Sequence, residues 1–218
     1  MTEFTLEVAE RHWLSEETFE IRFVRPPGFD YLPGQKVGFV DGAARRDYTM
    51  LGPVAAGHLS FCVRLVPGGR FSPKLAAARR GDRFAVTAPF GFFTFAPSPR
   101  QAVWVATGTG IAPFVAFVRA GVRGFDLLHG VRSPRGLYYR EELARAGRRY
   151  RPCISGPLPD DYDGPSPFGG RVGDGLRAGW PPGDYDFYLC GRGEMIRDLL
   201  AIIDSRYEGA HVHTERFY

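Results

Sequence analysis

The stretch from Ala102 to Val118, AVWVATGTGIAPFVAFV, constrains the fold more than any other part of the sequence. An apolar run is followed by the glycine-rich segment 107–110 and then by apolar residues at helical spacing, which predicts a strand, a tight turn and a helix. Glycines let the backbone approach a ligand closely, and the free N–H groups at the start of a helix attract anions. The stretch therefore predicts a cradle for the pyrophosphate of a dinucleotide, although a turn that binds nothing stays open at this point.

The length and composition fit a soluble globular protein with one large domain or two small ones. The chain has 218 residues and a net charge of +4, which is too small to indicate a nucleic-acid partner. Its three cysteines, Cys62, Cys153 and Cys190, lie far apart, so we expect no metal site and a reducing, cytoplasmic environment. No apolar run approaches the roughly 20 residues of a membrane span, and the N-terminus has no apolar signal core.

Positive charge gathers in two stretches of the chain. Residues 64–83 hold six lysines and arginines against one acid, and residues 132–151 hold seven arginines against two glutamates. Such patches suit phosphates or an acidic protein partner, and a solvated face with scattered arginines is the alternative.

The first part of the chain predicts a small antiparallel barrel or sandwich, because short apolar runs alternate with Gly and Pro turns. Strands are expected at residues 4–9, 18–24, 36–40, 58–66 and 83–95, with 45–50 completing six, and one helix at 71–78. After the linker at 97–99 the pattern changes to strands alternating with helices, which indicates a parallel sheet with helices on both faces. These strands are expected at 102–106, 125–131, 149–155, 186–191 and 210–218, and the helices at 111–119, 138–146 and 194–207.

The long loop 156–175 has no strong pattern, and loops of this length are often functional or mobile. We therefore expect two domains, residues 1–97 and 98–218, and a ligand that joins them would lie in the crevice between them.

The chain contains six short motifs whose order along the sequence is informative. They are Arg46-Asp47-Tyr48-Thr49, Gly69–Leu75 (GRFSPKL), Gly91-Phe92-Phe93, Gly108–Pro113 (GTGIAP), Leu189-Cys190-Gly191 with Met195, and Glu215–Tyr218 (ERFY). In this order they resemble the ferredoxin–NADP reductase superfamily over nearly the whole chain, and the ending is most similar to bacterial ferredoxin/flavodoxin–NAD(P)H reductases.

The resemblance implies an FAD-binding antiparallel β-barrel followed by an NAD(P)-binding α/β domain. It also implies an oxidoreductase that passes a hydride from NADPH or NADH to FAD and then single electrons to a separate ferredoxin or flavodoxin. The residues that it implies for cofactor binding are Arg46, Asp47, Tyr48, Thr49, Val63, Arg64, Val66, Gly69, Arg70, Phe71, Ser72, Thr107, Gly108, Thr109, Gly110, Ile111, Pro113, Arg132, Ser155, Arg171, Cys190, Gly191, Met195 and Tyr218.

The residue chemistry agrees with these flavin roles. Tyr48 offers a flat face for the isoalloxazine ring, with a barrel-wall tyrosine as the alternative. Arg46 carries a planar, always-charged fork for a diphosphate, and Thr49 can hydrogen-bond the N5 edge of the flavin. Ser72 and the helix start after Gly69 form a second anion site, with an ordinary helix cap as the alternative.

Four residues are expected to be catalytic: Thr49, Cys190, Glu215 and Tyr218. Cys190 lies at the end of a predicted strand, at the ligand-facing edge of a parallel sheet, and the resemblance places it beside the nicotinamide; a buried core cysteine is the alternative. A carboxylate at Glu215 suits proton relay or nicotinamide ordering. Tyr218 is expected to cover the second flavin face, with a frayed end as the alternative.

The choice between NADH and NADPH depends on the site for the 2′-phosphate. NADPH-specific relatives have a Ser-Arg pair where this chain has Ser155-Gly156, whereas Arg171 matches a second arginine and Arg132 is typical of both subgroups. Asp160 and Asp161 would repel a 2′-phosphate, so the sequence leans toward NADH.

Rival functions stay open on the same scaffold. One is the reductase of an oxygenase system, or an NAD(P)H reductase of free flavin or ferric chelates. Others are a flavin-binding redox sensor without turnover and a dinucleotide-binding structural protein without flavin. We expect a cytoplasmic monomer with no membrane span, no nucleic-acid partner and no metal; His211 and His213 alternate on a strand without a third ligand.

Overall fold

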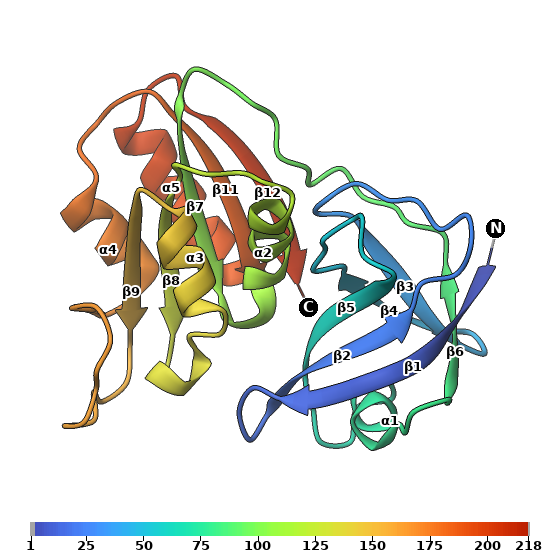
Figure 1. The fold of residues 1–218 in the computed structure, drawn as a ribbon. Coiled ribbons are helices and arrows are strands. Elements are labelled where there is room, and N and C mark those ends of the chain that lie inside the picture. The colour runs from blue at the N-terminus through green and yellow to red at the C-terminus, as the bar shows by residue number, and fades with distance from the viewer. Residues whose placement is uncertain (1–2, 218) are drawn as a thin grey trace. The chain divides into compact units, whose positions relative to one another are not determined.

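The computed structural model describes residues 3–217, and the contacts within it divide the chain into two compact units. The first unit comprises Met1–Phe95 and Ala112–Ala120, and the second comprises Ala96–Ile111 and Gly121–Tyr218. Each unit is built around its own six-stranded sheet (Figure 1).

The first unit contains an antiparallel sheet with the strand order β4-β3-β6-β1-β2-β5. The strands are β1 (Glu3–Trp13), β2 (Thr18–Val24), β3 (Lys36–Asp41), β4 (Ala44–Thr49), β5 (His58–Arg64) and β6 (Arg83–Thr87). The short helix α1 (Ser72–Ala77) follows β5. An isolated antiparallel bridge joins Met50, just after β4, to Phe61 in β5, so the two outer strands of the sheet are linked.

Alternation along the strands creates the core of this unit. Buried side chains such as Phe19, Ile21 and Phe23 from β2 share one core with Phe39 and Phe61. The Phe61 ring meets those of Phe23 and Phe39 edge to face. The predicted antiparallel, barrel-like first half is confirmed. The expected strand at 83–95 is wrong beyond Thr87, because the following residues form only the single bridge between Phe90 and Lys36.

The second unit contains a parallel sheet with the strand order β10-β9-β8-β7-β11-β12. The strands are β7 (Gln101–Thr107), β8 (Asp126–Val131), β9 (Arg149–Ile154), β10 (Phe168–Gly169), β11 (Tyr185–Arg192) and β12 (His211–Phe217). The helices are α3 (Arg140–Ala146), α4 (Val172–Gly179) and α5 (Gly193–Arg206), with short 3₁₀ turns η1 (Gly108–Ile111) and η2 (Pro134–Gly136).

Helices cover both faces of this sheet, as the sequence predicted. Side chains of α4 and α5, including Leu176 and Leu199, share one core with Val105, Leu128 and Leu189 of the strands. Figure 1 shows α3 on the opposite face, in front of β8 and β9. The helix α2 (Ala112–Arg119), which follows η1, has its contacts mainly in the first unit.

The structure differs from the sequence prediction in the long loop 156–175. Its second half forms the two-residue strand β10 and the start of α4, which buries Val172, Leu176 and the following Trp180. Three glycines in VGDGLRAG weaken the intrinsic helix preference, so tertiary packing of the apolar side chains decides this helix. The domain boundary at residue 97 stays a prediction.

Candidate functional site

The predicted flavin residues of the first unit project from β4 and from the turn that opens α1. Tyr48 is half-buried and packs edge to face on Phe39, with ring centroids 5.4 Å apart, while Arg46, two residues earlier on the same side of β4, is exposed. Burial raises the pKa of Tyr48 to about 12, so its hydroxyl stays protonated at neutral pH. Apart from Phe39, no aromatic ring among residues 3–217 contacts the Tyr48 ring.

Thr49 ends β4 with a buried side chain that is 3% exposed. Its hydroxyl oxygen has no hydrogen-bond partner among residues 3–217. A buried hydroxyl without a partner is unfavourable, and such a group marks a place where a ligand completes the bonding. The residues present therefore fit a flavin whose polar edge meets Thr49.

The start of α1 is tied to the end of β5 by local hydrogen bonds. The Val66 backbone N–H donates to the Ser72 hydroxyl at 3.0 Å, and the Gly69 N–H donates to the Val66 carbonyl at 2.9 Å. Ser72 is therefore not the cap of α1; the capping position belongs to Phe71. The Ser72 hydroxyl keeps its own proton for donation to an anion.

Asp41 was not singled out in the sequence, yet it ties the end of β3 to the segment that carries Arg70 and Lys74. Its carboxylate accepts hydrogen bonds from Arg70 Nε at 2.9 Å and from Lys74 Nζ at 2.6 Å. These bonds hold the pKa of Asp41 below its ordinary value. The available sequence signal was an acid at a hairpin end, which is too common to identify a partner in a distant helix.

Other residues of the predicted flavin set are already engaged in the first unit. Val63 is fully buried in the core, and Arg64 pairs with Glu17 at 3.0 Å. Asp47 accepts a hydrogen bond from Arg45 at 2.8 Å, and Val66 is 51% exposed. The structure thus groups Arg46, Tyr48 and Thr49 on one strand and gives Val63 a role in packing.

The predicted dinucleotide residues of the second unit meet where the strand order reverses. From β7 the chain continues outward through β8, β9 and β10 on one side, whereas β11 and β12 lie on the other. Ligands of open parallel sheets bind at such a switch point, beyond the carboxyl ends of the strands. The turn Thr107–Gly110 leaves β7 there, and Cys190-Gly191 lies near the same end of β11.

The glycine turn is packed on one side and open on the other. A side chain at Gly110 would collide with the Cys190 carbonyl, whereas a side chain at Gly108, which has φ +56°, would meet no atom within 4 Å. The Thr107 hydroxyl contacts Met195 Sδ at 3.5 Å. The close packing fixes the turn against β11, and the open side leaves backbone accessible near Gly108 and Thr109.

Cys190 and Glu215 are brought together on adjacent strands. They are register partners between β11 and β12, and Cys190 also pairs with Ala106 of β7. The Cys190 side chain is fully buried, and Glu215 is partly exposed. The predicted role of Tyr218 lies outside the described residues.

The predicted 2′-phosphate residues gather at the carboxyl ends of β8, β9 and β10. Backbone bonds join these ends, since the Ser155 N–H donates to Val131 at 3.0 Å and the Gly170 N–H donates to Ile154 at 2.9 Å. The side chains of Arg132, Ser155 and Arg171 are exposed there. The geometry therefore brings these three positions to one edge of the sheet.

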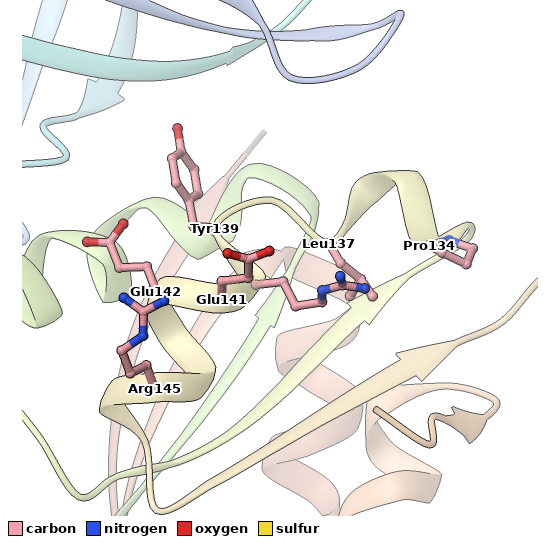
Figure 2. Close-up of a pocket in the computed structure, with 7 residues that line it drawn as sticks. Pro134, Leu137, Tyr139, Glu141, Glu142 and Arg145 are labelled. Atoms are coloured by element: carbon pink, nitrogen blue, oxygen red, sulfur yellow. The ribbon is translucent and has the colours of Figure 1, made fainter. Parts of the chain in front are cut away.

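Two hollows of the second unit lie beside this edge. One, of about 550 Å³, is lined by Ser133, Pro134, Arg135, Arg140, Pro157, Leu158, Pro159, Asp161, Tyr162 and Asp163. The other, of about 590 Å³, lies over η2 and α3 (Figure 2). Figure 2 shows Glu142 and Arg145 close together on α3 with Tyr139 pointing away from the helix, and no predicted site residue lines this second hollow.

Comparisons with known proteins agree with this geometry. Residues 5–95 match the oxidoreductase FAD-binding domain, and residues 104–200 match the oxidoreductase NAD-binding domain. The reductase component of propane 2-monooxygenase from Rhodococcus jostii is 28% identical over 84% of this chain and 54% of its own length. The electron transfer component of toluate 1,2-dioxygenase from Pseudomonas putida is 29% identical over 86% of this chain and 59% of its own length.

Among solved structures, a ferredoxin NADP⁺ reductase from Neisseria gonorrhoeae with bound FAD and NADP has the same fold. It superposes with a TM-score of 0.84 over 99% of both chains at 20% identity. The chain belongs to the ferredoxin–NADP reductase superfamily. The predicted FAD-binding and NAD-binding domains are confirmed by the two family models. The chain spans somewhat more than half the length of the two curated relatives.

No helix within residues 3–217 is long and apolar enough to cross a membrane. In the same range, no group of three or more His, Cys, Asp and Glu side chains is arranged to hold a metal ion.

Proposed function

We propose that this chain takes a hydride from NAD(P)H bound at the glycine turn onto FAD held by β4 and α1, and then delivers single electrons to a separate protein carrier. The observation that carries the proposal is the convergence of Thr107–Gly110, Cys190 and Glu215 at the switch point of the parallel sheet. When bound, FAD supplies the exchange between two-electron and one-electron chemistry.

The residues of the first unit have distinct tasks in this proposal. Tyr48 stacks on the flavin, Arg46 and Ser72 bind the diphosphate, and the unpartnered Thr49 hydroxyl meets the polar edge of the ring. Asp41 keeps Arg70 and Lys74 turned toward the β3–β4 hairpin, which orders the loop before α1. Together they orient the flavin and exclude water from one of its faces.

The residues of the second unit orient the nicotinamide. The backbone at Gly108 and Thr109 receives the pyrophosphate, since that side of the turn is open. Cys190 lines the nicotinamide site with a small polarisable side chain, and Glu215 on the neighbouring strand holds or moves a proton. Tyr218 is proposed to cover the flavin face that the nicotinamide must reach.

NADH is the proposed donor in preference to NADPH. The edge formed by Arg132, Ser155 and Arg171 lacks the arginine that follows the serine in NADPH-specific relatives. The adjoining hollow presents the carboxylates of Asp161 and Asp163, of which Asp163 lies 3.5 Å from Arg140. A carboxylate accepts hydrogen bonds from a ribose diol and repels a 2′-phosphate.

The acceptor is proposed to be a ferredoxin- or flavodoxin-type carrier. A second candidate function, the reductase of an oxygenase system, is favoured by the two curated relatives, which are components of such systems. The basic stretches predicted to steer an acidic carrier are partly neutralised, because Arg70 and Lys74 bind Asp41, and Arg148 binds Asp126. A cytoplasmic monomer remains our prediction for the assembly.

An anaerobic titration of the purified protein tests the proposed function. We expect bound FAD to be bleached by NADH at lower concentrations than by NADPH. Steady-state rates with ferredoxin, free flavin and ferric chelates then separate the candidate acceptors, and carrier reduction should slow as salt rises because steering is screened. A colourless protein that binds no added FAD, or a flavin that neither nucleotide reduces, would contradict the proposal.

A further inference from the structure

The hollow of about 550 Å³ beside the edge of the parallel sheet carries charges of both signs. It lies wholly within the second unit, and its volume is within the range of about 300–1,000 Å³ that small-molecule sites occupy. Arg135 of η2 and Arg140, the first residue of α3, line one side. Asp161 and Asp163 line the other side, from the loop 157–165, which we call the acidic loop. No motif of the sequence marked Arg140 as a ligand of the dinucleotide.

The acidic loop folds back on itself through Tyr162. The Tyr162 N–H donates to the Pro159 carbonyl oxygen at 3.1 Å, and the Tyr162 hydroxyl donates to the Pro165 carbonyl oxygen at 2.9 Å. A side chain at Gly164 would collide with the Tyr162 hydroxyl and would lie 2.7 Å from Arg140 Nη1. The closed loop therefore packs directly against the guanidinium of Arg140.

Arg140 has a carboxylate and a hydroxyl of the acidic loop beside it. The Arg140 side chain is 27% exposed, and its Nη1 lies 3.5 Å from the carboxylate of Asp163, whose side chain is 86% exposed. Burial raises the pKa of Tyr162, and the charge of Arg140 and its hydrogen bond to Tyr162 work against that rise. Arg140 is thus seated against Tyr162 and Gly164, whereas its partner Asp163 is open to water.

The pair of Arg140 and Asp163 matters more for a ligand than for the fold. An ion pair with so exposed a carboxylate contributes little to stability. Asp163 nevertheless offsets the charge of Arg140 and presents its own negative charge to the hollow. A ribose diol can donate hydrogen bonds to such a carboxylate, whereas a phosphate with a charge of about −1.5 to −2 at pH 7 is repelled by it. The pair can therefore discriminate between a nucleotide with a free ribose and one with a 2′-phosphate.

We propose that Arg140 is a latent ligand for the 2′-phosphate of NADPH and that Asp163 masks it, so that this pair sets the preference for NADH. The inference rests on the proposed function, and every residue in it belongs to the second unit. A guanidinium binds phosphate through a planar fork of N–H donors. Tyr162 and Gly164 still pack against Arg140 when the Asp163 carboxylate is neutralised, so the fork stays beside the hollow and becomes free for an anion.

Asp163→Asn tests the mask, because it removes the negative charge and keeps the shape of the side chain. A hydrogen bond between charged groups changes an affinity about tenfold, so the variant should bind NADPH about tenfold more tightly than the wild-type protein does. The affinity for NADH should fall by no more than about threefold, since the amide oxygen of asparagine still accepts a hydrogen bond from the ribose.

A second substitution shows whether this gain depends on Arg140. In the double variant that combines Asp163→Asn with Arg140→Gln, the affinity for NADPH should return to within about twofold of the wild-type value, because the guanidinium fork is gone. Asp160→Asn is the matched control, since it removes the same charge from the acidic loop at a position that does not line the hollow. The control should leave the ratio of the NADPH and NADH affinities unchanged.

The readout is calorimetric titration of the FAD-loaded protein with adenosine 2′,5′-bisphosphate and with 5′-AMP, which carry the two forms of the ribose and need no turnover. Stopped-flow reduction of the flavin by NADPH and by NADH measures the same preference for the whole dinucleotides. Tighter binding of the bisphosphate to Asp163→Asn, lost again in the double variant, supports the inference. An unchanged preference in Asp163→Asn would overturn it, as would a gain that persists without Arg140. If neither dinucleotide reduces the flavin of the wild-type protein, the proposed function fails and not only this inference.

Discussion

At the scale of single residues, a substitution at Thr49 distinguishes a role in packing from a role in cofactor binding. Its hydroxyl is buried without a partner among the described residues, whereas Val has nearly the same shape and no such group. Thr49→Val should leave the free energy of unfolding without FAD unchanged or raise it by about 1 kcal/mol. The same change should weaken FAD binding about fivefold, because one hydrogen bond of about 1 kcal/mol is lost. Urea unfolding with and without FAD measures both effects.

Thr87 provides the matched control for this substitution. Its hydroxyl accepts from the Gly38 N–H at 3.0 Å and donates to the Ala88 carbonyl at 2.8 Å. Thr87→Val should lower the free energy of unfolding by about 1–2 kcal/mol, since it leaves a buried donor unpaired, and it should not alter the stabilisation by FAD. If Thr49→Val destabilises the FAD-free protein as much as Thr87→Val, the Thr49 hydroxyl has a structural partner and our assignment is wrong.

His129 makes stability depend on pH. The ring is fully buried, its Nδ1 lies 3.0 Å from the Tyr150 hydroxyl, and burial lowers its pKa to about 3. In the unfolded chain the histidine pKa is about 6.5. Below about pH 6.5 the unfolded chain therefore binds a proton at His129, whereas the folded chain stays unprotonated there until a much lower pH. Stability should therefore fall as the pH drops from about 6.5 toward 3, by about 2 kcal/mol between pH 7 and pH 5.

The variant His129→Gln isolates this contribution, because glutamine does not titrate and the other histidines are common to both proteins. The wild-type protein should lose about 2 kcal/mol more unfolding free energy than the variant between pH 7 and pH 5, as measured by urea unfolding. If the unfolding free energies of the two proteins changed in parallel between pH 7 and pH 5, His129 would bind its proton in the folded chain as it does in the unfolded chain, and this prediction would be wrong.

At the scale of elements, the two glycines of η1 serve different purposes. Gly110→Ala forces a methyl group into the Cys190 carbonyl and should cost about 2–3 kcal/mol of stability. Gly108→Ala meets no atom of the chain, so it should cost only about 1 kcal/mol through its positive φ. Its methyl group would nevertheless project on the open side of the turn. Relative to the stability that each variant loses, we therefore expect Gly108→Ala to lose more NADH affinity than Gly110→Ala.

Thermal unfolding and NADH titration of the two variants measure this contrast. The ordering of stabilities follows from packing alone, and the ordering of affinities follows from the proposed pyrophosphate site. Equal NADH affinity in Gly108→Ala and in the wild-type protein would place the dinucleotide elsewhere.

The same elements show what the sequence can and cannot specify. The strand, turn and helix around Gly108 were predictable because hydrophobic period and glycine placement agree locally. Helix α4 was not, since its three glycines oppose it and it is stabilised by the packing of Val172 and Leu176 in a core shared with distant elements. The apolar residues after Thr87 have a strand-like sequence pattern, which led to the wrong prediction of a strand there. Phe93 is buried by its contacts with α2 and not by a neighbouring strand.

The candidate site divides in the same way. Arg46, Tyr48, Cys190 and Glu215 were proposed from short motifs, because each motif carries its own chemistry. The bond between Asp41 and Lys74, 33 residues apart, and the close approach of Phe117 to Gly34 depend on tertiary placement that no local pattern records.

At the scale of the whole molecule, the chain passes between its two units at three points and not once at a linker. The first unit ends at Phe95, the chain returns to it for 112–120, and then leaves it again. A cofactor that stabilises one unit should therefore also protect a helix that lies, in sequence, within the other.

Hydrogen exchange of the complete chain tests this expectation. Ligand binding lowers the rate of opening of the elements that it stabilises, so adding FAD alone should slow amide exchange in α2 together with β3 and β4. Adding NADH to the FAD-free protein should slow exchange in η1 and the start of α5 while leaving α2 nearly unchanged. Protection of α2 by NADH but not by FAD would mean that this helix follows the parallel-sheet unit in solution.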